Sequence, residues 1–364
     1  MRILYDGWIY GKQPLGGVSR YFNNIISRLP SDWFPFLVTK NCQTIQPPSH
    51  SRLQHFKFKG RPGPIGKWPE LGDRLTWFQK KNLLAPDLVH LTYYIPIGSK
   101  RISTYRAPIV VTVFDLIHEL VLNAGKDTDI MRAKREAIDQ AKAVICISEN
   151  TRRDLLRVYQ CDENKVHAIP LASSIELRPS SYSATNNVDP YLIYVGTRWP
   201  YKNFPRALEA FAAVRRGGLK IDLVVVGPAF SGDELESLSR LGIKSYVRNV
   251  GYVSDEVLGG LYQGAVALIY PSIYEGFGLP LLEAMTCETV IIAAKTSSIP
   301  EVIGKAGVLF DPYSVDELCH AIAKVVDDIA FRNNLIAEGR NQIKKFSWDR
   351  TVQETVEVYA NVGG

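Results

Sequence analysis

The sequence predicts an α/β fold of two Rossmann-like, doubly wound lobes facing a central cleft. A chain of 364 residues exceeds what one hydrophobic core usually organises. Short β-branched runs alternate with helical patterns, and the runs are almost continuously apolar, as parallel strands covered on both faces are. A polar, turn-rich stretch at 178–190 separates two sets of such strands, so we place lobes at 1–180 and 181–345.

Eight runs are predicted to be strands: Ile3–Asp6, Leu88–Tyr93, Ile109–Leu116, Ala143–Ser148, Tyr191–Gly196, Leu223–Gly227, Val266–Ser272 and Val290–Ala294. The helices between them begin at recognisable capping residues, such as Ser148, Ser254 and the Ser314-x-x-Glu317 spacing. Because ligands of doubly wound sheets bind at the carboxyl ends of the strands, functional residues are expected directly after the strands.

Composition is that of an ordinary globular protein, with 46% apolar and 22% charged residues. The chain starts without the apolar stretch of a secretory signal and contains no bilayer-length apolar run, so a cytoplasmic protein is expected. Five cysteines without a C-x-x-C spacing argue against a disulfide framework or a zinc site. Cys146 and Cys287 lie in apolar runs and are expected to be buried packing residues.

The positive charge is concentrated in the first lobe. Residues 1–180 carry a net charge of +10, whereas the remainder carries −4. The segment Arg52–Lys81 holds eight basic and two acidic residues interspersed with aromatic ones, which suits an anionic membrane surface or a phosphate-bearing acceptor. A solvated loop explains the same segment equally well. No recognition helix or RNA-stacking motif accompanies the charge, so nucleic acid is not expected as a partner.

Paired glycines, Gly16 and Gly17, follow the first strand and lead into the helical run Val18–Leu29. Glycines let the backbone approach a ligand, and a helix N-terminus offers free N–H groups to an anion. The pattern is neither a G-x-G-x-x-G fingerprint nor a P-loop. A phosphate site and a plain tight turn both remain open here.

Two cations, Arg198 and Lys202, follow the strand Tyr191–Gly196 and precede the helical run Pro205–Arg216. An Arg fork and a mobile Lys ammonium could together neutralise a diphosphate. Solvated loop cations are the alternative.

The stretch Glu275-Gly-Phe-Gly-Leu-Pro-Leu-Leu-Glu283 follows a predicted strand and enters a helix that Pro280 is suited to open. Small glycines leave backbone N–H groups accessible, and the helix start adds partial positive charge for a phosphate. Glu275 would lie over a sugar and Glu283 on the first helical turn, where carboxylates accept hydrogen bonds from hydroxyls. Both could instead interact only with the helix dipole.

These motifs, GGVSRY, GTRWPYKN and EGFGLPLLE, together resemble glycosyltransferase family four, whose members are retaining enzymes of the GT-B fold. The resemblance covers essentially the whole chain in order. It implies that the first lobe faces the acceptor, that the second binds a nucleotide-sugar, and that the C-terminal helix, 346–364, packs back on the first lobe.

The resemblance also implies a role for each matching residue. Arg198 and Lys202 bind the donor diphosphate, Glu275 the sugar hydroxyls and Glu283 the ribose. The remaining donor-binding positions are Gly16, Gly17, Gly276, Phe277, Gly278 and Leu279, with Tyr252 and Val253 at the base, after a strand-like Tyr246–Val250.

One position departs from the family pattern. Many members carry a His near the transferred sugar at the end of the strand that begins at Ile109, where this chain has Phe114. Phe cannot hydrogen-bond a sugar hydroxyl, so Asp115 or His118 substitutes, or the contact is absent; we favour Asp115. His90, also at a strand end, is a further candidate to face the acceptor, and a structural role fits either histidine as well.

No metal or other cofactor is expected. Asp127 and Asp129 have the D-x-D spacing that holds divalent cations in other glycosyltransferases, but they precede the helical run Ile130–Ala141, where capping and helix-dipole compensation explain them.

The expected function is retaining transfer of a hexose, mannose from GDP-mannose first, to a saccharide or lipid-linked acceptor in polysaccharide biosynthesis. A UDP-glucose- or UDP-N-acetylglucosamine-dependent transferase and a non-catalytic sugar-nucleotide-binding protein are the alternatives. An epimerase or a phosphorylase shares the architecture.

Overall fold

The computed structural model describes residues 1–13, 16–40, 47–58, 84–97, 102–123, 126–176 and 190–364. It divides into two compact units, Met1–Leu171 with Trp348–Gly364, and Ala172–Ser347. The expected boundary, after residue 180, lies nine residues beyond Leu171 and outside the described residues. Most of the basic segment Arg52–Lys81 also lies outside the described residues.

The first unit is built on a seven-stranded, all-parallel sheet of order β3-β2-β1-β4-β5-β6-β7. Its strands are β1 Arg2–Asp6, β2 Phe34–Lys40, β3 Gln54–Phe58, β4 Leu88–Leu91, β5 Ile109–Val113, β6 Ala143–Cys146 and β7 Val166–Ala168. Its helices are α1 Gly17–Ser27, α3 Asp129–Gln140, α4 Glu149–Tyr159 and α12 Trp348–Gly363.

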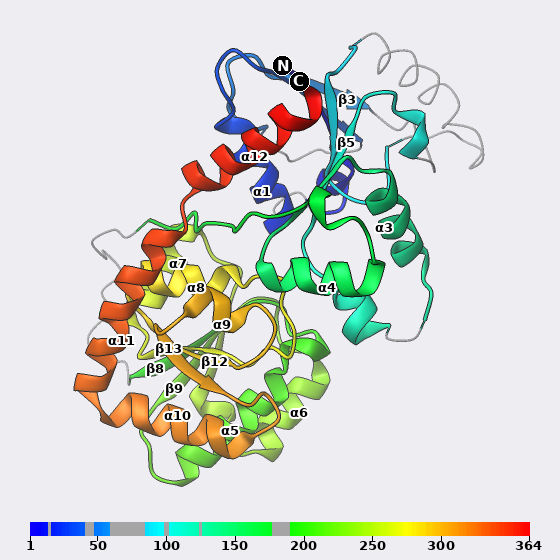
Figure 1. Cartoon of the computed structure of the whole chain (residues 1–364). Helices are drawn as coiled ribbons and strands as arrows, with labels where there is room; N and C mark the ends of the chain where they lie inside the picture. Colours follow the sequence, from blue (N-terminus) through cyan, green and yellow to red (C-terminus); the bar gives the residue numbers. More distant parts are fainter. Residues whose placement is uncertain (14–15, 41–46, 59–83, 98–101, 124–125, 177–189) are drawn as a thin grey trace. The chain divides into compact units, whose positions relative to one another are not determined.

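The last helix of the chain belongs to this first unit (Figure 1). Helix α12 packs against α1 and contacts β4 and β6. The Trp348 ring lies 6.4 Å from that of Tyr21, and the Thr351 hydroxyl donates to the Pro170 carbonyl at 2.7 Å. Burial of such side chains holds the C-terminal helix against the first unit, to which the N-terminal strand β1 also belongs.

The second unit holds a six-stranded, all-parallel sheet of order β10-β9-β8-β11-β12-β13. Its strands are β8 Tyr191–Val195, β9 Asp222–Val226, β10 Val247–Gly251, β11 Ala267–Tyr270, β12 Val290–Ala294 and β13 Gly307–Phe310. Its helices are α5 Phe204–Arg216, α6 Gly232–Arg240, α7 Asp255–Gly264, α8 Leu279–Thr286, α9 Ile299–Ile303, α10 Val315–Asp327 and α11 Ile329–Gln342.

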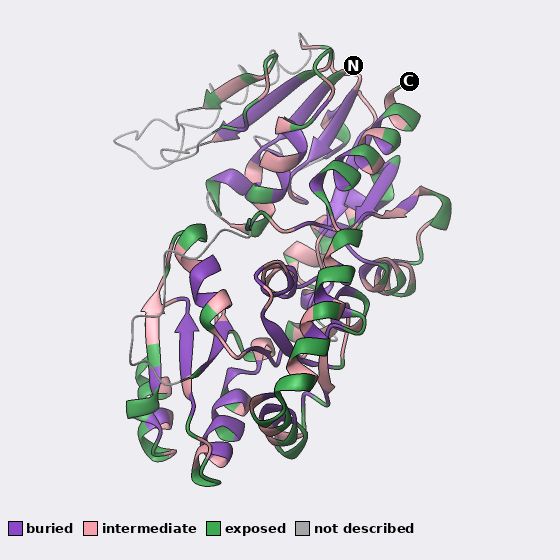
Figure 2. Cartoon of the chain, turned by 90° about the vertical axis from the view of Figure 1, so that its left-hand side faces the viewer, coloured by how far each residue is buried: buried purple, intermediate pink, exposed green. Residues whose placement is uncertain are grey.

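Both sheets are doubly wound, as predicted. The strand order reverses between β1 and β4 in the first sheet and between β8 and β11 in the second. Figure 2 shows the central strands almost wholly buried, while the helices alternate buried with exposed residues. Cys146 and Cys287 are buried, which confirms their predicted packing role. Among the described residues, no helix combines the length and apolarity needed to cross a bilayer.

The predicted caps are also present. The hydroxyls of Ser148, Ser254 and Ser314 accept backbone N–H groups at the starts of α4, α7 and α10. At Ser314 only half of the capping box is formed. The Ser314 hydroxyl accepts from the Glu317 backbone N–H, but the Glu317 carboxylate accepts from the backbone N–H of Asp311 rather than from that of Ser314.

Candidate functional site

The loop between β8 and α5 carries both predicted phosphate-binding cations. Its 3₁₀ turn, Pro200–Lys202, ends at Asn203, which has the left-handed φ of 57° that Asn tolerates. The buried Asn203 amide donates to the carbonyls of Pro271 and Pro312, which follow β11 and β13. The loop is thereby tied to the carboxyl edge of the sheet.

Lys202 and Glu275 form an ion pair, with 2.6 Å between Nζ and Oε1. The side chains are only 18% and 11% exposed, so solvent screens the pair weakly. Burial, and then the neighbouring Glu275 carboxylate, raise the pKa of Tyr270 well above its ordinary value. The residues that the sequence assigned to phosphate and sugar are therefore in direct contact.

The loop after β11 is held in place by two serines that no motif in the sequence predicts. The Ser297 hydroxyl accepts from the Glu275 backbone at 2.9 Å. The buried Ser298 hydroxyl contacts the carbonyls of Glu275 and Phe277, at 2.9 and 3.0 Å. These contacts fix the backbone on either side of Gly276.

Helix α8 begins directly after this loop, as predicted. Gly278 precedes it with a φ of 107°, and Pro280 lies in its first turn. The Phe277 side chain is buried, so only its backbone can serve a ligand. Glu283 accepts the Tyr262 hydroxyl at 3.0 Å. Helix α8 thus begins four residues after Glu275, the partner of Lys202, and a helix N-terminus offers free N–H groups to an anion.

Arg198 lies deeper than a solvated loop cation would, with its side chain 5% exposed. Its Nε and Nη2 donate to Glu234 at 2.5 and 3.1 Å, and Nη2 also donates to the Ala229 carbonyl at 2.8 Å. The guanidinium lies 5.0 and 5.5 Å from the ring centroids of Phe230 and Phe204. Within the described residues its Nη1 is buried without a hydrogen-bond partner.

A cavity of about 620 Å³ borders Arg198 between α5 and α6. Apolar residues that include Phe204 and Leu208 line it, with Ser231 and Arg240 among its polar residues. Tyr252 and Val253, predicted to hold a base, are not among its lining residues. Tyr252 follows β10 and is 78% exposed.

Glu234 is not among the predicted site residues, although the sequence carries a signal for it. Ser231-x-x-Glu234 has capping-box spacing, and the structure forms both hydrogen bonds of the box at the start of α6. The spacing identifies the helix start, but not the contact with Arg198.

In the first unit, Gly16 caps α1 and Gly17 begins it. A Cβ on Gly16 would lie 2.8 Å from the Gln13 Cβ, so a larger residue there would require Gln13 to shift. The tight turn is thus present, and the predicted contact of Gly17 with a phosphate stays a prediction.

The candidates for the missing histidine lie together after β5. The Asp115 carboxylate accepts from the Ile117 backbone at 3.1 Å, and His118 opens a single π-helical turn. Phe114 packs edge-on against Tyr21, at 5.3 Å between centroids, as an apolar side chain should. Both Asp115 and His118 are partly exposed, and the His118 Nδ1 lies 3.2 Å from the Asn123 side-chain nitrogen. Their predicted contact with the transferred sugar stays a prediction.

His90 is structural. It is fully buried, and its Nδ1 and Nε2 contact the hydroxyls of Tyr359 and Thr112 at 2.5 and 2.9 Å. Burial lowers the pKa of His90 to about 3, so the ring is neutral at physiological pH. The suggestion that it faces the acceptor is wrong, because both ring nitrogens are engaged within the core.

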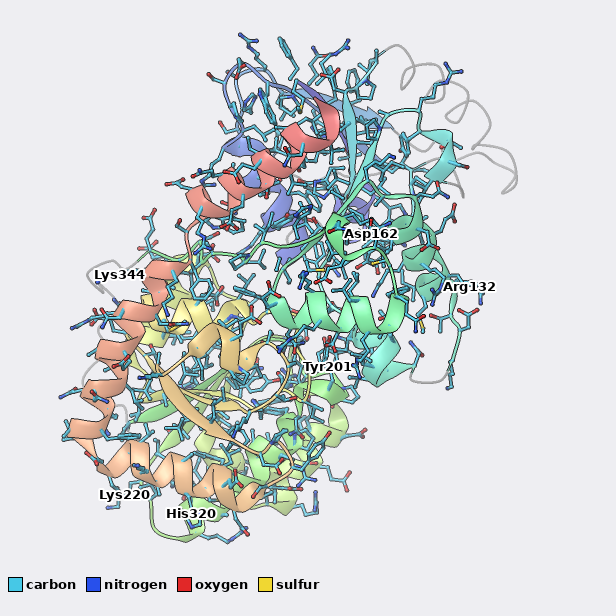
Figure 3. All side chains as sticks on the ribbon, viewed as in Figure 1. Arg132, Asp162, Tyr201, Lys220, His320 and Lys344 are labelled. Carbon is cyan, nitrogen blue, oxygen red and sulfur yellow. The ribbon has the colours of Figure 1, made fainter. Side chains whose placement is uncertain are left out.

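Asp127 and Asp129 both pair with Arg132, labelled in Figure 3, while Thr128 between them caps α3. In the part of the chain that the structure describes, no group of three or more metal-ligating side chains is found.

Two family matches together cover most of the chain. Residues 15–176 match "Glycosyltransferase Family 4" and residues 181–342 match "Glycosyl transferases group 1". O-antigen chain mannosyltransferase B of Escherichia coli is 32% identical over 239 residues, which cover 63% of this chain and 63% of that protein. The match thus spans less than two thirds of that relative's length.

The MMP alpha-(1->4)-mannosyltransferase of Mycolicibacterium hassiacum is 27% identical over 292 residues, 75% of this chain and 70% of that protein. Among solved structures, a sucrose-phosphate synthase from Thermosynechococcus elongatus superposes with a TM-score of 0.81 at 19% identity, over 99% of this chain and 98% of that one. That likeness shows the fold, two Rossmann-like lobes of the GT-B type. Fold, motifs and sequence matches agree: the chain belongs to glycosyltransferase family four and resembles its mannosyltransferases.

Proposed function

We propose that this glycosyltransferase moves mannose from GDP-mannose to a hydroxyl of a saccharide or lipid-linked saccharide, with retention of anomeric configuration. The observation that carries the proposal is the Lys202–Glu275 pair beside the start of α8, where a diphosphate and a sugar can be bound side by side. The names of the two mannosyltransferase relatives support mannose as the sugar.

Stabilisation of the leaving group is the main source of catalysis in this proposal. As the glycosidic bond lengthens, negative charge develops on the diphosphate. Lys202, the N-terminus of α8 and the Nη1 of Arg198, which has no hydrogen-bond partner among the described residues, are placed to receive that charge. The fold holds all three in place before the reaction, although a diphosphate has to share the Lys202 ammonium with Glu275.

The two carboxylates recognise the rest of the donor. Glu275 accepts hydrogen bonds from sugar hydroxyls and Glu283 from the ribose, with the base near Tyr252 and Val253. We propose attack on the same face as the departing diphosphate, which itself assists the incoming hydroxyl, and no metal ion takes part. Asp115 is our preferred partner for the transferred sugar.

The direct test is a donor panel. GDP-mannose, UDP-glucose and UDP-N-acetylglucosamine are each incubated with methyl α-mannoside and α-linked mannobioses, and nucleotide release and product are measured. We expect turnover with GDP-mannose, and an α-linked product in the NMR spectrum. Turnover with a UDP-sugar alone would move the assignment to that donor, and a β-linked product would refute retention. Donor binding seen by calorimetry without hydrolysis or transfer would indicate a non-catalytic protein.

We also propose that the basic segment Arg52–Lys81 brings the protein to anionic membranes, where lipid-linked acceptors reside. Replacing several of its basic residues by Gln should weaken binding to vesicles that contain anionic lipid. Unchanged binding would count against this contact.

A further inference from the structure

The carboxylate of Glu234 controls which N–H groups of Arg198 are free. A guanidinium has five N–H donors. Glu234 takes Nε and one Nη2 hydrogen, and the Ala229 carbonyl takes the other. Among the described parts of the chain, nothing accepts from the two N–H groups of Nη1.

Those two N–H groups lie where a ligand is expected. A Cβ placed on Gly227 would be 3.7 Å from Nη1 and 2.3 Å from the Gly196 carbonyl oxygen. Gly227 directly follows β9, so Nη1 lies at the carboxyl edge of the sheet. A buried, charged donor without a partner is unfavourable, and a bound anion would remove that penalty.

Glu234 is itself held rigidly by the start of α6. The Ser231 backbone donates to its Oε2 at 2.7 Å, and the Ser231 hydroxyl accepts from its backbone at 3.3 Å. Burial would raise the pKa of the Glu234 carboxyl, but hydrogen bonds from Arg198 and the Ser231 backbone lower it below its usual value. The carboxylate is thus a charged acceptor whose two oxygens are engaged by Arg198 and the Ser231 backbone.

We infer that Glu234 is a positioning residue for the donor diphosphate: it locks Arg198 so that Nη1 alone is presented to the phosphate oxygens. The inference rests on the proposed function. The two cations then differ in their carboxylate partners. Arg198 is held by Glu234, which lies outside the predicted donor site, whereas Lys202 is held by Glu275, which is predicted to bind the sugar.

The test is Glu234→Gln, which preserves the size of the side chain and suits a capping box, but removes the charge. Dissociation constants for GDP, UDP and inorganic pyrophosphate, and for guanosine and uridine, are measured by calorimetry. We expect the diphosphates that bind the unchanged protein to bind the variant about tenfold more weakly, because a charge-assisted contact is misaligned. Nucleoside affinity should not change.

A double-mutant cycle distinguishes positioning from a general loss of stability. In an Arg198→Ala background, Glu234→Gln should have no further effect on diphosphate affinity. Ser314→Ala, which removes a helix cap of the same unit at α10, should lower the melting temperature and leave diphosphate affinity unchanged.

Diphosphate binding within twofold of the unchanged protein, or an equal loss in the Arg198→Ala background, would overturn the role of Glu234 alone. If the unchanged protein bound none of the three diphosphate probes, both the proposed function and the role of Glu234 would be refuted.

Discussion

The most informative perturbation is Lys202→Met, which keeps the aliphatic stem and removes the ammonium. Two losses are expected from the structure. The 2.6 Å contact with Glu275 disappears, leaving a carboxylate that is 11% exposed without its cation. An unpaired, largely buried acceptor costs roughly 1–3 kcal/mol of folding free energy, and remaining solvent access keeps the loss below that of a fully buried pair.

The second loss is catalytic. Removing one preorganised donor to a developing anion typically lowers kcat by about 10²–10³. If Lys202 acts mainly on the departing diphosphate, kcat should fall by that factor, and donor affinity should fall less. Nucleotide release is followed at a temperature well below the melting point of the variant, so that the stability loss does not enter the rate.

The control is Lys220→Met, an exposed lysine of the same unit that is labelled in Figure 3. It should match the unchanged protein in both rate and stability. A folded Lys202→Met enzyme that retains kcat within about threefold would refute the leaving-group role, and near-normal turnover in both Lys202→Met and Arg198→Ala would remove the basis of the donor assignment.

Three further outcomes are expected. Burial lowers the pKa of His90 from 6.5 to about 3, so between these values the unfolded chain binds a proton that the folded chain does not. The contribution of His90 to the free energy of unfolding should therefore shrink by roughly 1 kcal/mol per pH unit as the pH drops below 6.5. Denaturant titrations at several pH values should show that the free energy of unfolding of His90→Gln falls less steeply with decreasing pH than that of the unchanged protein. Identical pH dependence in the two proteins would contradict a role of His90. Gly278→Ala should lower both melting temperature and donor affinity, since its φ of 107° is unfavourable for Ala and an added Cβ would lie 2.8 Å from Leu281; an unchanged melting temperature would argue against the strain. Turnover should persist in excess EDTA, because Asp127 and Asp129 are paired with Arg132; complete loss that Mn²⁺ restores would overturn metal independence.

The fold could be predicted because its signal is local. Each of the eight predicted runs became a strand, since apolar β-branched residues suit the interior of a parallel sheet. The runs Ile109–Leu116 and Ala143–Ser148 end earlier than predicted, where the backbone turns into a loop or a cap. Strands β2, β3, β7 and β13 escaped prediction. Pro35 interrupts the pattern of β2, and β7 has only three residues, too few to show a period.

The site could be predicted only as two separate halves. Strand ends and glycines identify the loops of Lys202 and Glu275, but 73 residues separate the two side chains, and no local pattern predicts their contact. The same limit applies to Arg198 and Glu234, which are 36 residues apart. His90 shows the opposite error: a strand-end histidine matches a functional pattern, yet its role is decided by Tyr359, from the far end of the chain.

The pairing of Lys202 with Glu275 has a consequence for how a donor would bind. On the proposed function, a diphosphate competes with Glu275 for the Lys202 ammonium, and a carboxylate that loses its cation in a largely buried loop needs new donors. The hydroxyls of the sugar supply them. GDP alone should therefore bind less tightly than GDP-mannose, because GDP binds the Lys202 ammonium but lacks the mannose hydroxyls that would donate to the freed Glu275 carboxylate. Glu275→Gln, which weakens the competition, should narrow that difference. Recognition of phosphate and sugar would then be coupled through a single ion pair, rather than being the sum of two independent contacts.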